Sequence, residues 1–391
     1  MNIKKRVDEL FESLVKIRRD FHMYPELSEK EYKTSDKICA YLDEWGIEYE
    51  KGIAQIGVVA IIRGKEGGKT VGARADIDAL PIKEQNDLAF KSVYNGVMHA
   101  CGHDVHITIH LGVAKLFKEM ENELLGNVKI FFQPAEETIG GANRMIQQGC
   151  LKNPNVDYVT SLHVMPSIDA GYVEMKYGKL NAATNEFYIK IIGQSSHAAY
   201  PEQSIDTIVT AGYIITALQS FISRNISPLN SAVVTLGQIH GGTKNNVISG
   251  EVVMSGTLRT LDQDTRKYAK EKIKNIVENT AKAHGAKAEI KFEEGYPALI
   301  NNDEVVDVLK ETSERLLGTD KVLFKEFPSM GADDFSFFCQ KTKGAYYNLG
   351  CGNHAKGWNA PIHSEYFMVD EECIKTGVAL QVEVLLQLLK K

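Results

Sequence analysis

The chain has 391 residues, of which 43% are hydrophobic and 25% are charged. That composition is typical of a soluble globular protein, and the length is too great for one ordinary core, so we expect two domains. The net charge of −6 argues against a nucleic acid or an anionic membrane as a partner. Because there is no signal-peptide pattern and no apolar run of about 18 residues, a cytoplasmic protein is expected.

The first part of the chain alternates helical and strand patterns. Apolar residues at helical spacing predict helices over residues 1–20, 34–45 and 105–120. Short apolar runs predict strands over residues 56–63, 70–74, 127–133 and 158–164. This alternation indicates an α/β domain around a mixed, largely parallel sheet covered by helices.

The middle of the chain follows a different order, strand-helix-strand-strand-helix-strand. These elements are predicted over residues 186–193, 205–222, 232–239, 247–261, 262–284 and 288–294. The order is that of a ferredoxin-like α+β domain. Helices over 304–317 and 371–389 and a strand over 345–349 then return to the first pattern. We therefore expect a discontinuous catalytic domain, residues 1–183 and 299–391, into which residues 184–298 are inserted as a lid or dimerisation domain.

The densest chemistry lies in the segment His99-Ala-Cys-Gly-His-Asp-Val-His106. Gly102 permits a sharp backbone turn between Cys101 and His103, so that both side chains can converge on one centre. Thiolate and imidazole are the ligands that zinc and neighbouring metals prefer. The alternative is a helix start with incidental histidines. Of the two, the segment favours metal binding.

A pair of glutamates, Glu136 and Glu137, follows a predicted buried strand that stops at Pro134. Neighbouring residues on a regular strand face opposite sides, so two carboxylates serve one site only where the strand has given way to a loop. One carboxylate can then bind a metal while the other carries protons. In isolation, a solvated pair of loop glutamates is the better interpretation, because such pairs are common.

Two further histidines stand at a predicted strand end and in a loop. His163 lies in an apolar strand, where a lone histidine is more often a satisfied core residue. His363 lies in a proline-containing loop, where it is as easily an ordinary surface residue. Their joint placement with the two motifs in one α/β domain, where ligand sites form, makes both of them candidates.

These motifs together resemble a known family, the aminoacylase and carboxypeptidase-like amidohydrolases. The family includes hippurate hydrolase, plant auxin-conjugate hydrolases, N-acetyldiaminopimelate deacetylase and bacterial N-acyl-amino-acid deacylases. The segments occur in the family's order over nearly the whole chain: RADIDALP (74–81), HACGHDVH (99–106), QPAEE (133–137), GQSSHAAYP (193–201), GGTKNNVI (241–248) and GTLR (256–259).

The resemblance implies a metal-dependent hydrolase that cleaves the amide bond of small N-acyl L-amino acids. It implies two divalent metal ions. Zinc suits thiolate and imidazole, while the carboxylate also suits manganese, cobalt or nickel. The positions that match metal ligands are Cys101, His103, Glu137, His163 and His363.

Catalytic and substrate-binding positions match as well. Glu136 matches the general base, and Asp76 matches an acidic residue that orients a metal ligand. His197, which would hold the oxyanion, Asn246 and Arg259 match substrate-binding positions. In relatives this histidine can reach the active site of a neighbouring subunit. Arg259 would pair with the substrate carboxylate through two parallel hydrogen bonds, although a surface arginine at a sheet edge is an equally good interpretation.

The sequence departs from the family at three places. Serines precede His197 where relatives often carry glycines, Asp333 stands where glutamate is common, and Ser249 stands where proline is usual. These positions belong to the lid and the pocket rather than to the ligands. They leave the acyl group and the amino acid open.

Other functions are compatible with parts of the pattern. A dipeptidase or aminopeptidase would use the same metals on a substrate with a free amine. A non-catalytic binding protein is disfavoured by Glu136 beside Glu137, and a redox protein built on Cys101 by the absence of a Cys-x-x-Cys spacing. A sheet edge in the inserted domain favours a homodimer or homotetramer.

Overall fold

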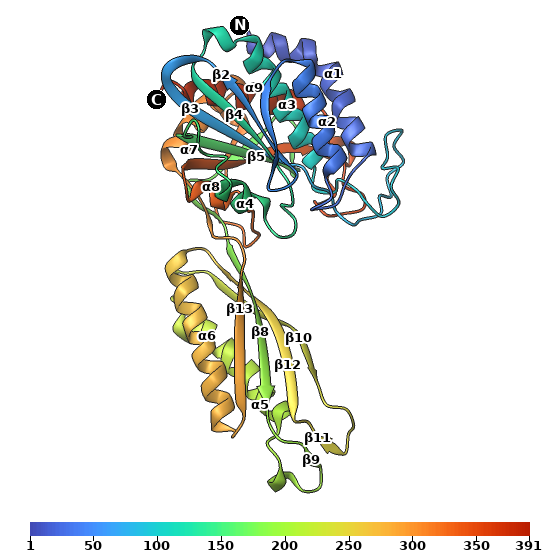
Figure 1. Ribbon diagram of the computed structural model, residues 1–391, viewed down its shortest axis with the longest axis vertical. Helices are drawn as coiled ribbons and strands as arrows, with labels where there is room; N and C mark the ends of the chain where they lie inside the picture. Colours follow the sequence, from blue (N-terminus) through green and yellow to red (C-terminus); the bar gives the residue numbers. More distant parts are fainter. The chain divides into compact units, whose positions relative to one another are not determined.

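The computed structural model describes residues 1–391, which divide into two compact units (Figure 1). The larger unit comprises residues 1–178, 300–327 and 334–391, and the smaller unit comprises residues 179–299 and 328–333. The sequence pattern had placed 328–333 in the catalytic domain. This segment groups with the smaller unit because Ser329 N–H donates to the Leu180 carbonyl at 2.8 Å and Gly331 O accepts from Ala182 N–H at 2.9 Å.

An eight-stranded mixed sheet forms the centre of the larger unit, in the order β1-β2-β4-β3-β5-β16-β6-β15. The four central strands, β4, β3, β5 and β16, are mutually parallel, and β1 and β2 run antiparallel at one edge. The predicted α/β fold class is confirmed. The strands are β1 (Glu48–Ile53), β2 (Gly57–Arg63), β3 (Lys65–Asp76), β4 (Leu125–Gln133), β5 (Tyr158–Asp169), β6 (Val173–Met175), β15 (Val322–Phe324) and β16 (Lys343–Gly352).

Helices cover both faces of this sheet. Ile130 of β4 packs in the core cluster that contains the buried residues of α1, α3 and α9, whereas Phe131 meets Phe338 of α8 at 5.2 Å between ring centroids. Because neighbouring strand residues face opposite sides, α8 lies on the other face from α3. The helices are α1 (Ile3–Met23), α2 (Tyr32–Glu44), α3 (His103–Glu119), α4 (Gly141–Gln147), α7 (Asp303–Leu317), α8 (Ser336–Cys339) and α9 (Cys373–Leu388).

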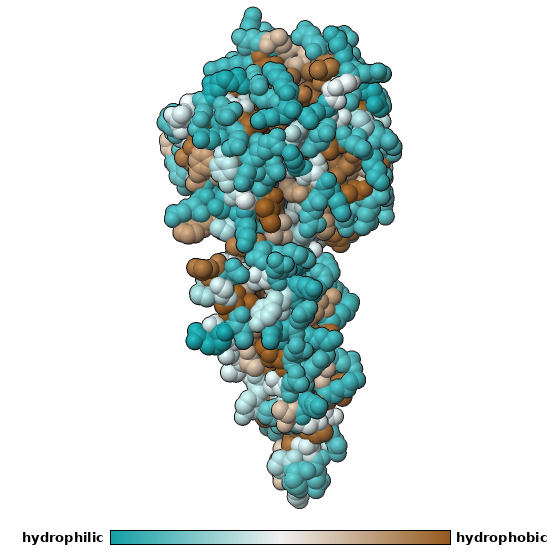
Figure 2. Space-filling model, turned by 90° about the vertical axis from the view of Figure 1, so that its left-hand side faces the viewer, coloured by the Kyte–Doolittle hydropathy of each residue, from teal (hydrophilic) through white to brown (hydrophobic).

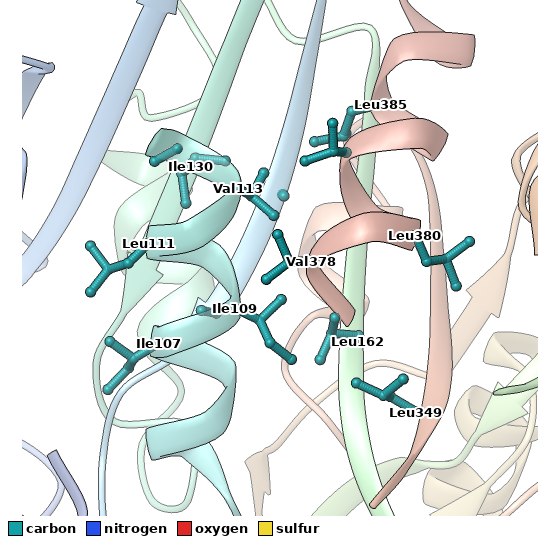
Figure 3. Packing of buried hydrophobic residues seen from close by; sticks show 14 of the residues in the cluster. Ile107, Ile109, Leu111, Val113, Ile130, Leu162, Leu349, Val378, Leu380 and Leu385 are labelled. Atoms are coloured by element: carbon teal, nitrogen blue, oxygen red, sulfur yellow. The ribbon is translucent and has the colours of Figure 1, made fainter. Parts of the chain in front are cut away.

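The core between α3 and α9 is tightly packed (Figure 3). Val378 of α9 lies beside Ile109 and Val113 of α3, and all three are fully buried. Gly377 allows this approach, because a Cβ there would lie 2.4 Å from Ile109 Cδ1. Close packing of this kind holds α3 rigidly against the sheet, and the first residue of α3 is His103.

The smaller unit has a four-stranded antiparallel sheet in the order β10-β12-β8-β13, packed on one face against α5 and α6. This is the predicted ferredoxin-like arrangement. A separate pair, β9 with β11, extends from it, and β7 (Gly178–Asn181) pairs with β14 (Leu299–Asn301). The remaining elements are β8 (Ala183–Ile192), β9 (Ser196–His197), α5 (Thr207–Asn225), β10 (Ala232–Gly241), β11 (Val247–Ile248), β12 (Glu251–Thr260), α6 (Gln263–Ala283) and β13 (Lys287–Glu294).

Hydrophilic residues predominate on the face shown in Figure 2, and hydrophobic residues are scattered among them. Scattered apolar residues of this kind are normal on a protein surface and need no partner to cover them. None of the helices has both the length and the apolar character required to cross a bilayer.

Candidate metal centre and active site

The left-handed backbone conformation of Gly102 lets the side chains of Cys101 and His103 point toward the same centre. Gly102 has φ +82° and directly precedes α3, which begins at His103. A Cβ on Gly102 would lie 2.3 Å from Val164 Cγ2, so only glycine fits both the conformation and the space. The sharp turn that the sequence predicted is therefore present, and it is held against β5.

His103 presents one ring nitrogen to the centre of the cluster. Its Nδ1 is 3.1 Å from Asp78 Oδ1, which makes Nδ1 the donor, so the neutral ring has its lone pair on Nε2. His103 is fully buried, and Nε2 has no hydrogen-bond partner. A buried polar atom without a partner destabilises a fold unless a ligand completes it. A carboxylate on one nitrogen with the other nitrogen free is the usual arrangement of a metal-binding histidine.

Cys101 lies between two groups of potential ligands. Its Sγ is 3.2 Å from His163 Nε2, while His163 Nδ1 donates to the Val164 carbonyl at 2.7 Å. One group joins Cys101, His103 and His163, and within it the ligand atoms lie within 4.8 Å of one another. A second group joins Cys101 with Glu137 and His363 under the same limit. The shared thiol makes one continuous cluster of the five predicted ligands.

The loop after β4 supplies both glutamates. β4 ends at Gln133, directly before Pro134, as the sequence predicted. Glu137 Oε1 is 3.2 Å from His363 Nε2, and a carboxylate oxygen of Glu136 lies within 4.8 Å of ligand atoms of His103 and Glu137. The loop thus turns two successive carboxylates toward the same cluster.

The electrostatics of the cluster favour a bound cation. Burial, together with Glu137, Glu136 and Asp76, raises the pKa of Cys101 well above its usual value. Burial lowers the pKa of His103, but the nearby carboxylates outweigh it and raise this pKa to about 10. Without a cation, protons on these groups balance the carboxylates. Divalent ions would replace those protons and leave the thiolate and imidazole free to coordinate.

Asp76 faces two histidines, because its Oδ1 lies 3.7 Å from Nε2 of the predicted ligand His103 and is hydrogen-bonded to His106. Asp76 Oδ1 accepts from His106 Nδ1 at 2.5 Å, and its other oxygen accepts from Arg74 at 2.5 Å. His106 Nε2 accepts from a backbone N–H at 2.9 Å, so this histidine is a satisfied structural residue. The carboxylate that is hydrogen-bonded to the predicted ligand His103 is Asp78, which sequence reasoning missed. Asp78 lies two residues beyond Asp76, where β3 ends, and carboxylates at a strand end are candidates for a ligand site.

The three predicted substrate-binding residues lie in the smaller unit and do not come together there. His197 lies in β9, and Asn246 directly precedes β11; both are exposed, and Ala198 N–H donates to the Asn246 carbonyl at 3.0 Å. Arg259 lies at the far end of β12, eight residue steps from Glu251, which follows β11. At about 3.3 Å a residue, these steps span about 26 Å. Within one unit, His197 and Arg259 therefore lie at opposite ends of the sheet.

Known proteins resemble the chain over its full length. Residues 72–387 match Peptidase family M20/M25/M40. Thermostable carboxypeptidase 1 of Saccharolobus solfataricus is 40% identical over 96% of this chain and 95% of its own. N-acetylcysteine deacetylase of Bacillus subtilis is 38% identical over 92% and 93%. Hippurate hydrolase of Campylobacter jejuni is 35% identical over the whole of both chains.

Two solved structures superpose closely. A putative aminohydrolase from methicillin-resistant Staphylococcus aureus has a TM-score of 0.95 and 32% identity over the whole of both chains. A Bacillus subtilis protein, described as a dinuclear metal-binding peptidase of the M20 family, has a TM-score of 0.86 and 33% identity over 98% of this chain and 99% of its own.

Proposed function

The chain belongs to peptidase family M20/M25/M40, and on that premise we propose that it hydrolyses N-acyl L-amino acids to a carboxylic acid and a free amino acid. The family and the hydrolases among its relatives confirm the predicted enzyme class, a metal-dependent amidohydrolase. One observation carries the proposal. The buried, unpartnered Nε2 of His103 stands in a cluster of metal-ligating side chains that also contains two adjacent carboxylates, Glu136 and Glu137.

In this proposal, the two groups of side chains that have Cys101 in common would hold two divalent ions. One group adds His103 and His163 to Cys101, and the other adds Glu137 and His363. Bound ions of this kind lower the pKa of water and polarise an amide carbonyl. The donor set of one thiolate, three imidazoles and one carboxylate suits zinc, manganese, cobalt or nickel.

Glu136 acts as the general base. It is buried and lies next to the ligand Glu137 in the chain, and it has no place in either ligand set that shares Cys101. It takes a proton from the attacking water and passes it to the amide nitrogen, which leaves as the free amine. Each transfer moves one proton through one carboxylate, which ends the cycle ionised as it began.

The substrate is an amide whose nitrogen belongs to an amino acid with a free α-carboxylate. Arg259 binds that carboxylate through its guanidinium, while His197 holds the oxyanion and Asn246 contacts the acyl side. Because His197 and Arg259 lie at opposite ends of β12 in one unit, we infer that a second copy of the chain supplies His197.

A carboxypeptidase that acts on short peptides is the second candidate. The specific observation in its favour is the 40% identity with the Saccharolobus carboxypeptidase. Both candidates require a free carboxylate on the leaving amino acid and differ in what the acyl group is. A dipeptidase or aminopeptidase would instead require a free amine on the acyl side.

A substrate panel tests the proposal. Protein reconstituted with zinc or manganese is assayed for released amine on N-acetyl-L-methionine, N-benzoylglycine, N-acetyl-L-methioninamide and glycyl-L-methionine. We expect hydrolysis of the first two. The amide, which lacks the carboxylate, should react at least about tenfold more slowly, since it loses a charge-assisted pair. Faster turnover of glycyl-L-methionine than of N-acetyl-L-methionine would support a peptidase activity and overturn the proposal.

A further inference from the structure

The loop that carries Glu136 has a backbone conformation that is unfavourable for its sequence. Ala135 has φ +55°, in the left-handed region. For a residue with a Cβ this conformation costs about 1–2 kcal/mol. Such strain persists only where the surrounding structure over-determines it. The contacts of Ala135 therefore show what holds the loop in place.

Two carboxylates from outside the loop hold it on both sides of Glu136. Glu31 Oε1 accepts from the backbone N–H of Ala135 at 2.8 Å. Asp78 Oδ2 accepts from the backbone N–H of Glu137 at 3.0 Å. The Pro134–Ala135 and Glu136–Glu137 peptide groups are thus anchored to different segments of the chain. These bonds restrict the rotation of the backbone that aims the Glu136 side chain.

Glu31 is itself rigidly placed. It directly precedes α2, and its carbonyl accepts from Ser35 N–H at 2.9 Å in the first turn of that helix. Ser35 Oγ in turn donates to the Ile56 carbonyl at 2.6 Å, which fixes α2 beside β2. The Glu31 side chain is fully buried, and its bond to Ala135 is its only hydrogen bond to another segment.

We propose that Glu31 is a positioning residue for the reaction, which holds the Ala135 turn so that the Glu136 carboxylate is aimed at the water and the leaving nitrogen. The inference rests on the proposed function for the role of Glu136. It separates two tasks: Glu31 holds the side of the loop that aims the base, and Asp78 holds the side that aims the ligand Glu137. The loss of Glu31 therefore slows proton transfer and leaves metal binding intact.

Two variants at Glu31 test this role in the full-length protein. Glu31→Met keeps the chain length and removes the acceptor, while Glu31→Gln keeps an acceptor oxygen. For Glu31→Met we expect kcat for N-acetyl-L-methionine to fall between about tenfold and a hundredfold, because small misplacements of reacting groups cost that much. KM and the zinc dissociation constant, measured by competition with a chromogenic chelator, should change less than about threefold. Glu31→Gln should restore kcat to near wild type.

A readout without activity keeps the test independent of the substrate. Hydrogen exchange of peptides that cover residues 131–140 should be faster at Ala135 in Glu31→Met and unchanged in Glu31→Gln. Glu26→Ala is the matched control, because Glu26 lies in the same segment and accepts from Thr34 N–H and Oγ rather than from the loop. It should lower stability and leave kcat unchanged.

Three results would overturn the inference: wild-type kcat in Glu31→Met, equal losses in Glu31→Met and Glu31→Gln, or a parallel loss of zinc and kcat. If the wild-type protein is inactive but Glu31→Met still increases the hydrogen-exchange rate of Ala135, the proposed function alone is overturned. If Ala135 exchanges at the wild-type rate in Glu31→Met, only the claim that Glu31 anchors the loop is overturned.

Discussion

Asp76 and Asp78 stand two residues apart at the end of β3, and their carboxylates serve different histidines. Asp78 accepts from His103, whose other nitrogen faces the ligand cluster, and Asp76 accepts from His106, whose other nitrogen is bonded to the backbone. A carboxylate behind a metal-binding imidazole fixes the tautomer and raises the basicity of the ring. On this geometry we expect Asp78, which is hydrogen-bonded to His103, to support metal binding more directly than Asp76, which is hydrogen-bonded to His106.

The Asp78→Asn substitution should therefore weaken metal binding. An asparagine keeps the shape of the side chain and removes its charge, so we expect the dissociation constant for zinc to rise about 10- to 100-fold. Asp76→Asn is the matched comparison and should change that constant less than about threefold while it lowers the free energy of unfolding. Chelator competition measures both variants. A larger loss of zinc affinity in Asp76→Asn would favour the role that the resemblance gave to Asp76.

The sequence predicted which side chains form this cluster, but not all of the contacts between them. The dense spacing around Cys101 and the glutamate pair after Pro134 pointed to the chemistry that the structure brings together. The choice between Asp76 and Asp78 depends on where His103 lies across the sheet, which no local pattern contains. Glu31 gave no signal, because its partner is a backbone N–H more than a hundred residues away.

The junction between the Cys101 loop and α3 depends on a single glycine. An alanine at Gly102 meets two penalties, the left-handed backbone and a contact of 2.3 Å with Val164. Strain and overpacking together should lower the free energy of unfolding by about 2–5 kcal/mol. The movement should also separate Cys101 from His103 and weaken zinc binding.

Gly149→Ala is the control for this prediction. Gly149 has φ +91°, and a Cβ there would have no atom within 4 Å. This substitution should cost only the backbone strain of about 1–2 kcal/mol and leave zinc binding unchanged. Urea unfolding and chelator competition compare the two variants. Equal effects of both variants on zinc binding would show that the space at Gly102 is not what places the ligands.

The periodicity of hydrophobic residues predicted the long helices and strands, but it did not predict the short or polar ones. Helix α6, predicted over residues 262–284, begins after Asp262, whose carboxylate accepts from Thr265 N–H. Strand β1 was missed because its sequence EYEKGI is polar and its residues are mostly exposed at the sheet edge. β6 and β15 have three residues each, too few for any alternation to show. Their places in the sheet come from tertiary pairing.

At the scale of the whole molecule, the separation of His197 from Arg259 predicts that active sites are shared between subunits. His197→Ala and Glu136→Gln should each be inactive. A purified mixed dimer of the two variants contains one site with both residues intact, so we expect about half of the wild-type activity to return. A mixed dimer of Cys101→Ala with Glu136→Gln is the control and should stay inactive, since both residues belong to the larger unit. An inactive first dimer would place His197 within its own subunit.

The central claim is that five side chains would hold two ions beside a further carboxylate, Glu136, which acts as the base, and the Glu136→Gln variant tests it most directly. The variant is stripped of metal and reloaded with zinc, and then its metal content and its kcat for N-acetyl-L-methionine are measured on the same sample. The account predicts two ions per chain, as in the wild type, with kcat lowered at least about a hundredfold. Fewer than two ions at saturation in the wild type, or an undiminished kcat in the fully loaded variant, would contradict it.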